Sequence, residues 1–216
     1  IVDEHYYQGW KWFLDHLSRY DSYPRGGSKV YVGEYASWGN EWQNALAEAA
    51  FMTSLERNGD VVEFASYAPL LGRIGHTQWN PDLIYFDGKA VYPTVNYYVQ
   101  QLFSLHRGDT YHSGIVSGPD GNLLPCASCV SDSRTGDIIV KMVNLGEEQT
   151  IAIDLSQFRR IGSTATLTVL SGDLKAKNTR ESPGTILPEE KTLKIKKHST
   201  YTMPAHSLSV IRIKSK

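Results

Sequence analysis

The sequence predicts an α/β segment over residues 1–108, followed by an all-β segment over residues 109–216. In the first segment, β-branched and aromatic runs alternate with stretches whose apolar residues recur at helical spacing, which indicates strands and helices in turn. In the second segment, short apolar–polar alternations are separated by turn sequences such as "SGPDGN" and "SRTGD". We therefore expect parallel strands covered by helices, and then an antiparallel β-sandwich.

Three pairs of strand and helix make up the first segment. "IVDEHYY" predicts a strand, and apolar residues at helical spacing follow it from Trp10 to Tyr20. "KVYVGEYA" predicts the second strand, and the helix after it has an apolar face from Ala45 to Leu55 and closes at "NG". "DVVEFASYAPLL" predicts the third strand, which a loop over about residues 69–91 joins to the helix "TVNYYVQQLFSLH". Because three pairs cannot close an eight-stranded barrel, the segment is either part of an open sheet or the end of a barrel.

The second segment contains five strand candidates, which are "DIIVKMVNL", "QTIAIDLS", "TATLTVLSG", "KTLKIKK" and "SLSVIRIK". In the last two, Leu or Ile alternates with Lys or Arg. Such alternation is typical of strands with one buried and one solvated face, as in an antiparallel sheet. Several strands of this kind at turn-marked intervals predict a sandwich.

Composition excludes two classes of partner. The formal net charge is -1 and there is no basic block, so we expect no nucleic-acid binding. No apolar run approaches the length needed to cross a bilayer, so we expect no membrane partner. The two cysteines form a single C-x-x-C, Cys126 to Cys129, which lacks the second ligand pair of a zinc site, and we expect no metal there.

Glu34 is the first candidate for chemistry. In a parallel sheet or barrel of this type, catalytic groups collect at the carboxyl ends of strands. Glu34 follows the buried run "VYV" and Gly33, which allows close approach of backbone or ligand. A carboxylate at the end of a buried strand is costly unless it is paired or used. It is therefore either a nucleophile at the strand tip or a solvated strand end, and the pattern alone leaves both open.

Glu41, seven residues later, has a structural explanation. Asn40 is a favourable N-cap and Gln43 lies three residues further on, a variant of the capping box. This would place Glu41 in the first turn of a helix, where a negative side chain suits the macrodipole. Two carboxylates on one loop are also poorly placed to face each other across a glycosidic bond at about 5 Å.

Polar residues near the other strand ends are further candidates. His5 and Tyr7 lie two apart on a strand, so both side chains point the same way and can reach a pocket shared with Glu34. They fit equally well as a hydrogen-bonded pair inside the fold. The loop "GRIGHTQWNPDLIYFDG" is rich in aromatic and amide side chains, which is typical of sugar sites but also of packing loops.

Several of these motifs together resemble one family. "DEHYY", "VGEYA", "NALAEAAFMTSLERNGDVVEFASYAPLL", "WNPDLIYFD" and "NYYVQQLFS" resemble consecutive motifs of the α-L-arabinofuranosidases of glycoside hydrolase family fifty-one. Downstream, "NTRESPGTILPEE" and "HSLSVIRIK" resemble the carboxyl-terminal sandwich of the same family. The resemblance covers almost the whole chain.

The resemblance implies a fold and a set of roles. The fold would be strands six to eight of a (β/α)₈ TIM barrel, followed by a jelly-roll-like β-sandwich. Glu34 matches the nucleophile that ends strand seven, and His5 and Tyr7 match a pair at the end of strand six that contacts sugar or nucleophile. Beyond strand eight, Trp79 aligns with a sugar-contacting residue.

In the same loop, the resemblance implies that Asn80 or Asp82 makes the polar contact with the sugar. The substrate implied is terminal arabinofuranose on arabinan, arabinoxylan and related glycans, cleaved with retention of configuration. No metal and no organic cofactor are implied. We expect a periplasmic or extracellular location rather than a cytoplasmic one, and we allow for a homo-oligomer.

One part of the family pattern is missing. The acid/base glutamate of the family follows an Asn at the end of strand four, which would lie upstream of Ile1. "GNE" at residues 39–41 imitates that dipeptide but follows the nucleophile, so Glu41 is interpreted as a decoy. The chain also opens directly on a strand, and we expect a fragment or processed chain with at most residual hydrolysis, because acid/base assistance supplies a factor of about 10² to 10⁴.

Two alternative functions remain. The chain can be a non-catalytic carbohydrate-binding or structural module led by the β-sandwich. After residue 111, however, the only aromatic residues are Phe158 and Tyr201, which are few for stacking on sugars. The other alternative is a related barrel glycosidase with a different sugar preference, such as a xylosidase.

Overall fold

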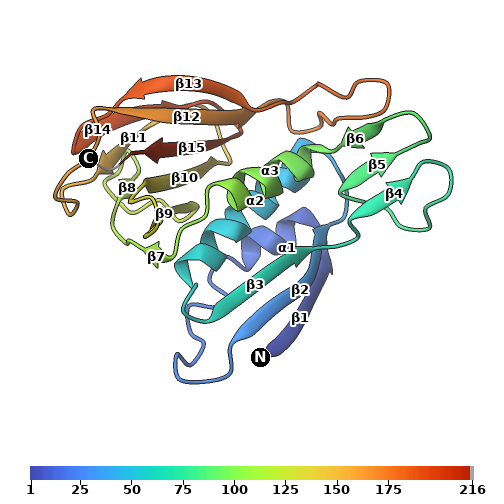
Figure 1. Ribbon diagram of the computed structural model, residues 1–216, viewed down its shortest axis with the longest axis horizontal. Helices are drawn as coiled ribbons and strands as arrows, with labels where there is room; N and C mark the ends of the chain where they lie inside the picture. Colours follow the sequence, from blue (N-terminus) through green and yellow to red (C-terminus); the bar gives the residue numbers. More distant parts are fainter. Residues whose placement is uncertain (215–216) are drawn as a thin grey trace.

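Three parallel strands form the sheet of the amino-terminal half. In the computed structural model, which describes residues 1–214, they are β1 (Val2–Gln8), β2 (Val30–Ser37) and β3 (Val62–Tyr67), in the order β1-β2-β3. Helices α1 (Trp10–Asp15) and α2 (Trp42–Arg57) connect them, and α3 (Val95–Leu105) follows (Figure 1). The predicted strands and helices of this half are therefore present, although α1 ends five residues before Tyr20.

One face of this sheet is buried against helices and the other is open. On the buried face, Tyr6, Val32 and Tyr35 pack with Phe13 of α1 and Phe51 of α2. This cluster is dominated by aromatic rings, whose edge-to-face contacts add to the energy of burial. The opposite face carries exposed side chains, and the candidate site lies there.

The segment expected to be a loop contains a second, small sheet. Its strands are β4 (Leu71–Arg73), β5 (Ile84–Phe86) and β6 (Val91–Pro93). β4 and β5 are parallel, whereas β5 and β6 form a hairpin. Each strand has only three residues, which is too short for alternation to be recognised in the sequence.

The carboxyl-terminal half consists of two antiparallel sheets packed face to face. The larger sheet has the strand order β13-β12-β15-β10-β9-β7 and the smaller one β14-β11-β8. Apolar side chains from both sheets, among them Met142, Ile151 and Ile211, form the core between them. The strands are β7 (Thr110–Tyr111), β8 (Val116–Ser117), β9 (Ala127–Ser131), β10 (Ile138–Asn144), β11 (Gln149–Asp154), β12 (Thr164–Ser171), β13 (Glu189–Lys194), β14 (His198–Met203) and β15 (Ser207–Ile213).

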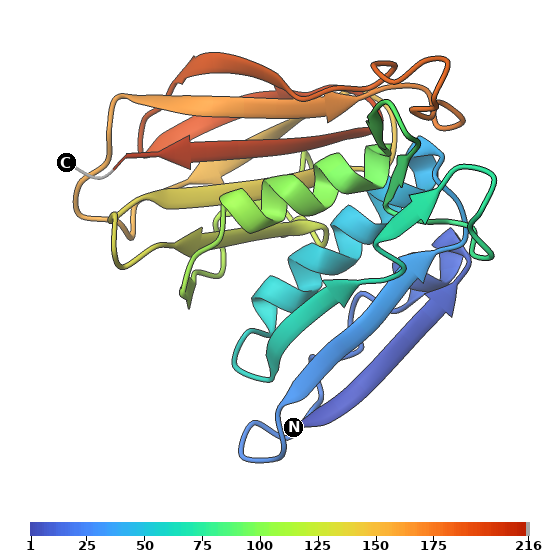
Figure 2. The same cartoon turned by 45° about the vertical axis from the view of Figure 1, so that its right-hand side comes forward.

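Helices α2 and α3 form a layer between the parallel sheet and the six-stranded sheet, as Figure 2 shows. The hydrophobic core between these helices and the six-stranded sheet is shared by both halves. Leu46 and Val99 from the helices pack there with Ile139 and Val210 from β10 and β15. Among residues 1–214, no helix is both long and apolar enough to cross a bilayer.

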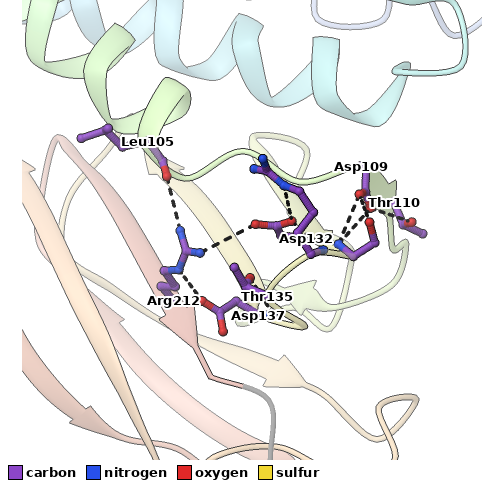
Figure 3. Close-up of polar contacts among 9 residues, drawn as sticks. Leu105, Asp109, Thr110, Asp132, Thr135, Asp137 and Arg212 are labelled. Atoms are coloured by element: carbon purple, nitrogen blue, oxygen red, sulfur yellow. Dashed lines mark hydrogen bonds and ion pairs between the residues drawn. The ribbon is translucent and has the colours of Figure 1, made fainter.

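A polar cluster fixes the end of α3 to the sandwich (Figure 3). Arg212 on β15 donates to the Leu105 carbonyl at 3.3 Å and to the Asp137 carboxylate at 2.7 Å, and lies 4.0 Å from Asp132. Backbone and side-chain donors around the β9–β10 turn hold the pKa of Asp132 below its usual value. Arg212 therefore connects the last turn of α3 to both ends of the turn between β9 and β10.

Candidate functional site

The candidate site lies on the open face of the parallel sheet, where His5 of β1 is paired with Glu34 of β2. The register shifts between Glu4 and His5, which leaves Gly33 as an extra residue in β2. Strict alternation would place Glu34 on the same face as Val30 and Val32, which is buried. The bulge at Gly33 reverses this, because a bulge re-aims the side chains that follow it. Glu34 therefore turns to the open face while Tyr35 enters the core.

The structure brings Glu34, Tyr7 and His5 together. The Tyr7 hydroxyl donates to Glu34 Oε2 at 2.6 Å, and His5 Nδ1 lies 3.7 Å from the same oxygen. Burial, followed by the hydrogen bond to Glu34 and its charge, raises the pKa of Tyr7 to about 12. Tyr7 is therefore a hydrogen-bond donor to this carboxylate at any physiological pH.

Asp3 completes the group, and the sequence interpretation did not single it out. Its Oδ2 lies 3.0 Å from His5 Nε2, so the imidazole stands between two carboxylates. Asp3 also packs against the bulge: a Cβ at Gly33 would lie only 2.0 Å from Asp3 Oδ1, so a larger residue at Gly33 would require the Asp3 side chain to move. The two-residue spacing of Asp3, His5 and Tyr7 is the signal that would have identified it.

Glu34 lies within its strand rather than at the tip where the sequence interpretation placed it. β2 continues for three more residues, to Ser37. The continuation arises because Ser37 still pairs with Gln8 of β1. The side chain of Glu34 is 45% exposed, which leaves room for a ligand on this face.

Glu4, on the opposite face of β1, has a different environment. Its carboxylate accepts hydrogen bonds from the hydroxyls of Tyr6, Tyr20 and Tyr23, with Arg19 at 3.6 Å. Burial alone would raise the pKa of Glu4, but these donors bring it below the usual value. Glu4 is thus an ionised anchor beneath the sheet, with its lone pairs already occupied.

The prediction that Asn40 caps α2 is wrong. Glu41 is the N-cap, and no side chain makes a capping hydrogen bond there. Instead, the first free amides of α2, those of Trp42 and Gln43, donate to the carbonyls of Ala176 and Leu174 in the sandwich. Glu41 accepts from Gln43 at 2.7 Å and pairs with Lys175 at 3.1 Å. Carbonyls from a distant segment thus replace the local cap that the sequence suggested.

Trp79, Asn80 and Asp82 lie beside the β4–β6 sheet. Trp79 is 61% exposed, and the side chain of Asn80 lies 3.3 Å from the Tyr85 hydroxyl. Asp82 is only 1% exposed; its Oδ2 accepts from Thr77 at 2.9 Å, and burial raises its pKa. Within residues 1–214, no hydrogen bond or ion pair joins these three residues to Glu34, Tyr7 or His5.

Cys126 and Cys129 do not form a joint site. Both are free thiols, and burial raises their pKa values to about 11 and about 12. Cys126 belongs to the core shared with the helices, whereas Cys129 belongs to the core between the two sheets. Cys129 lies in β9, whereas Cys126 lies in the turn that precedes it, so the two thiols enter different cores.

Comparison with known proteins finds arabinofuranosidases along almost the whole chain. Residues 33–207 match a family model described as the C-terminal domain of alpha-L-arabinofuranosidase. An extracellular exo-alpha-L-arabinofuranosidase of Streptomyces chartreusis is 59% identical over 109 residues, which is 50% of this chain and 13% of that protein. The probable alpha-L-arabinofuranosidase A of Aspergillus oryzae is 36% identical over 97% of this chain.

Solved structures agree with this. An arabinose-bound GH51 arabinofuranosidase superimposes with a TM-score of 0.89 at 35% identity, covering 99% of this chain and 37% of that one. The arabinofuranosidase of Thermotoga maritima, at 16% identity and a TM-score of 0.77, shares the fold. The chain spans 33% of the length of the Aspergillus oryzae relative.

Proposed function

Because this chain belongs to the α-L-arabinofuranosidase family, whose C-terminal domain residues 33–207 match, we propose that it is part of a retaining, exo-acting α-L-arabinofuranosidase. The proposed substrate is a glycan with terminal arabinofuranose, of the arabinan or arabinoxylan type; the arabinose-bound structural neighbour supports this choice. The extracellular relative favours a periplasmic or extracellular location.

Glu34 is the proposed nucleophile. It attacks the anomeric carbon and forms a covalent glycosyl-enzyme, while a second carboxyl group protonates the leaving oxygen and then activates water. The observation that carries this assignment is the 2.6 Å hydrogen bond from Tyr7 to Glu34 on the open face of the sheet. A single donor on Oε2, with the carboxylate 45% exposed, orients Glu34 and leaves it accessible.

The rest of the reaction centre is proposed to lie outside this chain. A retaining pair stands about 5 Å apart, and the chain covers only 33% of a typical relative. We assign the three-stranded sheet to strands six to eight of a (β/α)₈ barrel with its open face inward. Residues 109–216 would be the jelly-roll-like domain.

In the loop after β3, Trp79 is proposed to contact the sugar. Asn80, which is exposed, suits the polar role better than Asp82, whose carboxylate is buried and held by Thr77.

The nucleophile assignment is tested in a full-length arabinofuranosidase that contains residues 1–216. Glu34→Ala should lower turnover of an aryl α-L-arabinofuranoside by about 10⁴-fold or more, as removal of a nucleophile does in other enzymes. Added azide should then restore product as a glycosyl azide of inverted configuration, because one displacement replaces two. Glu63→Ala, at an exposed position of β3, is the matched control and should keep its turnover.

Two results would contradict this proposal. Rescue by azide with retained configuration would make Glu34 the acid/base instead. Higher activity of the unaltered protein on aryl xylosides than on aryl arabinofuranosides would favour a xylosidase.

A binding module built on the sandwich has little support. Phe158 packs edge-on against His112, and Tyr201 is 9% exposed with its hydroxyl bonded to Ser209. Tyr201 therefore offers no free surface for a sugar, and Phe158 is only partly exposed.

A further inference from the structure

A hollow lies at one end of the sandwich, and we refer to it as the end hollow. It has a volume of about 510 Å³, within the range of pockets that hold small molecules. The turn between β9 and β10 forms one wall, and the segment between β11 and β12 forms another. All of its lining residues belong to the carboxyl-terminal half, so the end hollow is separate from the Glu34 group. The lining residues used below are His112, Ser131, Phe158, Arg159 and Arg160.

The fold gathers at this end cations that come from two separate segments of the sequence. Residues 155–163 form the connection between β11 and β12. Backbone hydrogen bonds of 2.6 and 3.0 Å join this connection to residues 197 and 195, which lie between β13 and β14. The two segments are thus held side by side, although neither is a basic block by itself. The exposed cations that they bring to this end are Arg159, Arg160, Lys194, Lys196 and Lys197.

These five cations have no carboxylate partner within residues 1–214, because the acidic groups at the same end have other partners. The pairs are Asp132–Arg134 at 3.5 Å, Asp137–Arg212 at 2.7 Å and Asp154–His198 at 3.3 Å, the first two in the region that Figure 3 shows. Asp109 accepts a hydrogen bond from the Ser133 amide at 3.2 Å and does not line the end hollow. The surroundings of the end hollow are therefore positive, although the chain as a whole has a formal charge of -1. A hollow lined by one sign of charge attracts ligands of the opposite sign.

The other lining groups favour a sugar acid over a simple anion. A guanidinium group matches a carboxylate with two parallel hydrogen bonds, which suits Arg159 or Arg160. The Ser131 hydroxyl and the His112 ring nitrogen, 2.9 Å apart, are hydrogen-bonding groups for hydroxyls. Phe158 is partly exposed and adds an apolar surface for C–H groups. Inorganic phosphate would use the cations and leave the Phe158 ring without a contact.

We propose that the end hollow binds a uronic acid residue of an acidic polysaccharide, with Arg159 and Arg160 on its carboxylate. Lys194, Lys196 and Lys197 would face the carboxylates of neighbouring sugars. This recognition depends on charge rather than on stacking, which is consistent with the few aromatic residues of the sandwich. The choice of a polysaccharide as the carrier of the carboxylates rests on the proposed function, in which the substrate is a glycan. The site would hold the enzyme on acidic regions of the material from which it releases arabinofuranose.

The test uses a short oligogalacturonate, which carries a carboxylate on each sugar and has no arabinofuranose. Isothermal titration of a full-length arabinofuranosidase that contains residues 1–216 should detect binding. The affinity should fall when salt rises from about 0.05 M to about 0.5 M, because exposed charges are screened. The fully methyl-esterified oligomer has the same sugars without the charge, and it should bind about tenfold more weakly or worse.

Variants of the cations locate the site. Arg159→Gln/Arg160→Gln should weaken the affinity for oligogalacturonate about tenfold or more, because the charged hydrogen bonds to the carboxylate are lost. Lys196→Gln/Lys197→Gln should weaken it by a smaller factor, since an exposed ammonium is a point charge that water and salt screen.

Two controls separate this site from the rest of the protein. Arg73→Gln/Lys89→Gln removes the same number of positive charges at exposed positions of the first half and should bind like the unaltered protein. Glu34→Ala should also keep its affinity for oligogalacturonate. Retained hydrolysis in Glu34→Ala would count against the proposed function and leave the end hollow standing. Circular dichroism checks that each variant is folded.

Four results would overturn the inference. They are no binding by the unaltered protein, equal affinity for the methyl ester, unchanged affinity in folded Arg159→Gln/Arg160→Gln, and an equal loss in Arg73→Gln/Lys89→Gln. Binding of duplex DNA more than about tenfold tighter than of oligogalacturonate would make the site a polyphosphate site and overturn the choice of a polysaccharide.

Discussion

Glu48 on α2 is a carboxyl group with no exposed surface, directly beneath the end of the strand that carries Glu34. Its Oε1 accepts from the Ser37 amide at 2.8 Å and its Oε2 from the Asn96 side chain at 2.9 Å. Burial raises its pKa to about 8, and these two hydrogen bonds only partly oppose the shift. At neutral pH Glu48 is therefore mainly protonated, which avoids burying a charge.

We predict that Glu48 makes the protein less stable as pH rises. The folded state holds this proton up to about pH 8, whereas the unfolded chain releases it near the ordinary glutamate pKa of 4.5. The stabilisation is thus complete below about pH 4.5 and is lost progressively up to about pH 8, for a total of a few kcal/mol at about 1.4 kcal/mol per unit.

Urea unfolding between pH 5 and 8 checks this prediction. Glu48→Gln should flatten the decline of unfolding free energy with pH, because the amide does not titrate. Glu63→Gln, at an exposed position, should keep the slope of the unaltered protein. Asp82 also has a raised pKa and contributes to the pH dependence of every variant. The test therefore compares the slopes of the variants with one another. An equal slope in Glu48→Gln would contradict the assignment.

Between elements, α2 is attached to the sandwich by one buried ion pair. Lys141 on β10 is completely buried, and its ammonium lies 2.6 Å from Glu56 Oε1, whose side chain is 18% exposed. Ser128 also donates to Glu56. Desolvation offsets much of the attraction in such a pair, but removing one partner leaves an uncompensated buried charge.

We therefore predict that Lys141→Met lowers the free energy of unfolding by about 3–5 kcal/mol, towards the lower end because Glu56 is partly exposed. The double variant Lys141→Met/Glu56→Leu should recover most of this loss. Lys194→Met, on the exposed edge strand β13, should change stability by less than about 0.5 kcal/mol. Urea denaturation of the unaltered protein and the three variants checks this prediction, and a double variant no more stable than Lys141→Met would contradict it.

Elements with a strong local pattern were predictable from the sequence, and those set by distant contacts were not. The strands β1, β2 and β3 and the helices α2 and α3 follow from apolar periodicity. β9 was missed because its Ala, Ser and Cys side chains carry no strand signal, and β14 because alternate residues are exposed and polar. The start of α2 depends on carbonyls about 130 residues away, which local capping rules do not include.

The candidate site likewise has features that local sequence predicted and features that it did not. The spacing of His5 and Tyr7 predicted their shared face, because strand geometry is local. The bulge at Gly33 that turns Glu34 towards them depends on pairing with β1, which becomes visible only when the strands are aligned. Gly33 was recognised as a point of close approach, but the Asp3 carboxylate that approaches it was not.

At the scale of the whole molecule, the two halves share one core. Leu46, Val99 and Phe103 from α2 and α3 are buried by Ile139, Val143 and Val210 of the six-stranded sheet. Neither half can bury this surface alone, although each also has a core of its own. Segments joined through a large apolar contact unfold together, whereas those joined by a polar interface move separately.

We accordingly predict a single cooperative unfolding transition, which two natural probes can follow. All five tryptophans lie in residues 1–108 and both cysteines in residues 109–216, so fluorescence reports on the first half and thiol reactivity on the second. Their urea midpoints should coincide, and residues 109–216 expressed alone should show thiols that react without denaturant, at least at Cys126, which the helices cover. If fluorescence changes fully before either thiol becomes reactive, the halves fold independently and the shared core contributes little to stability.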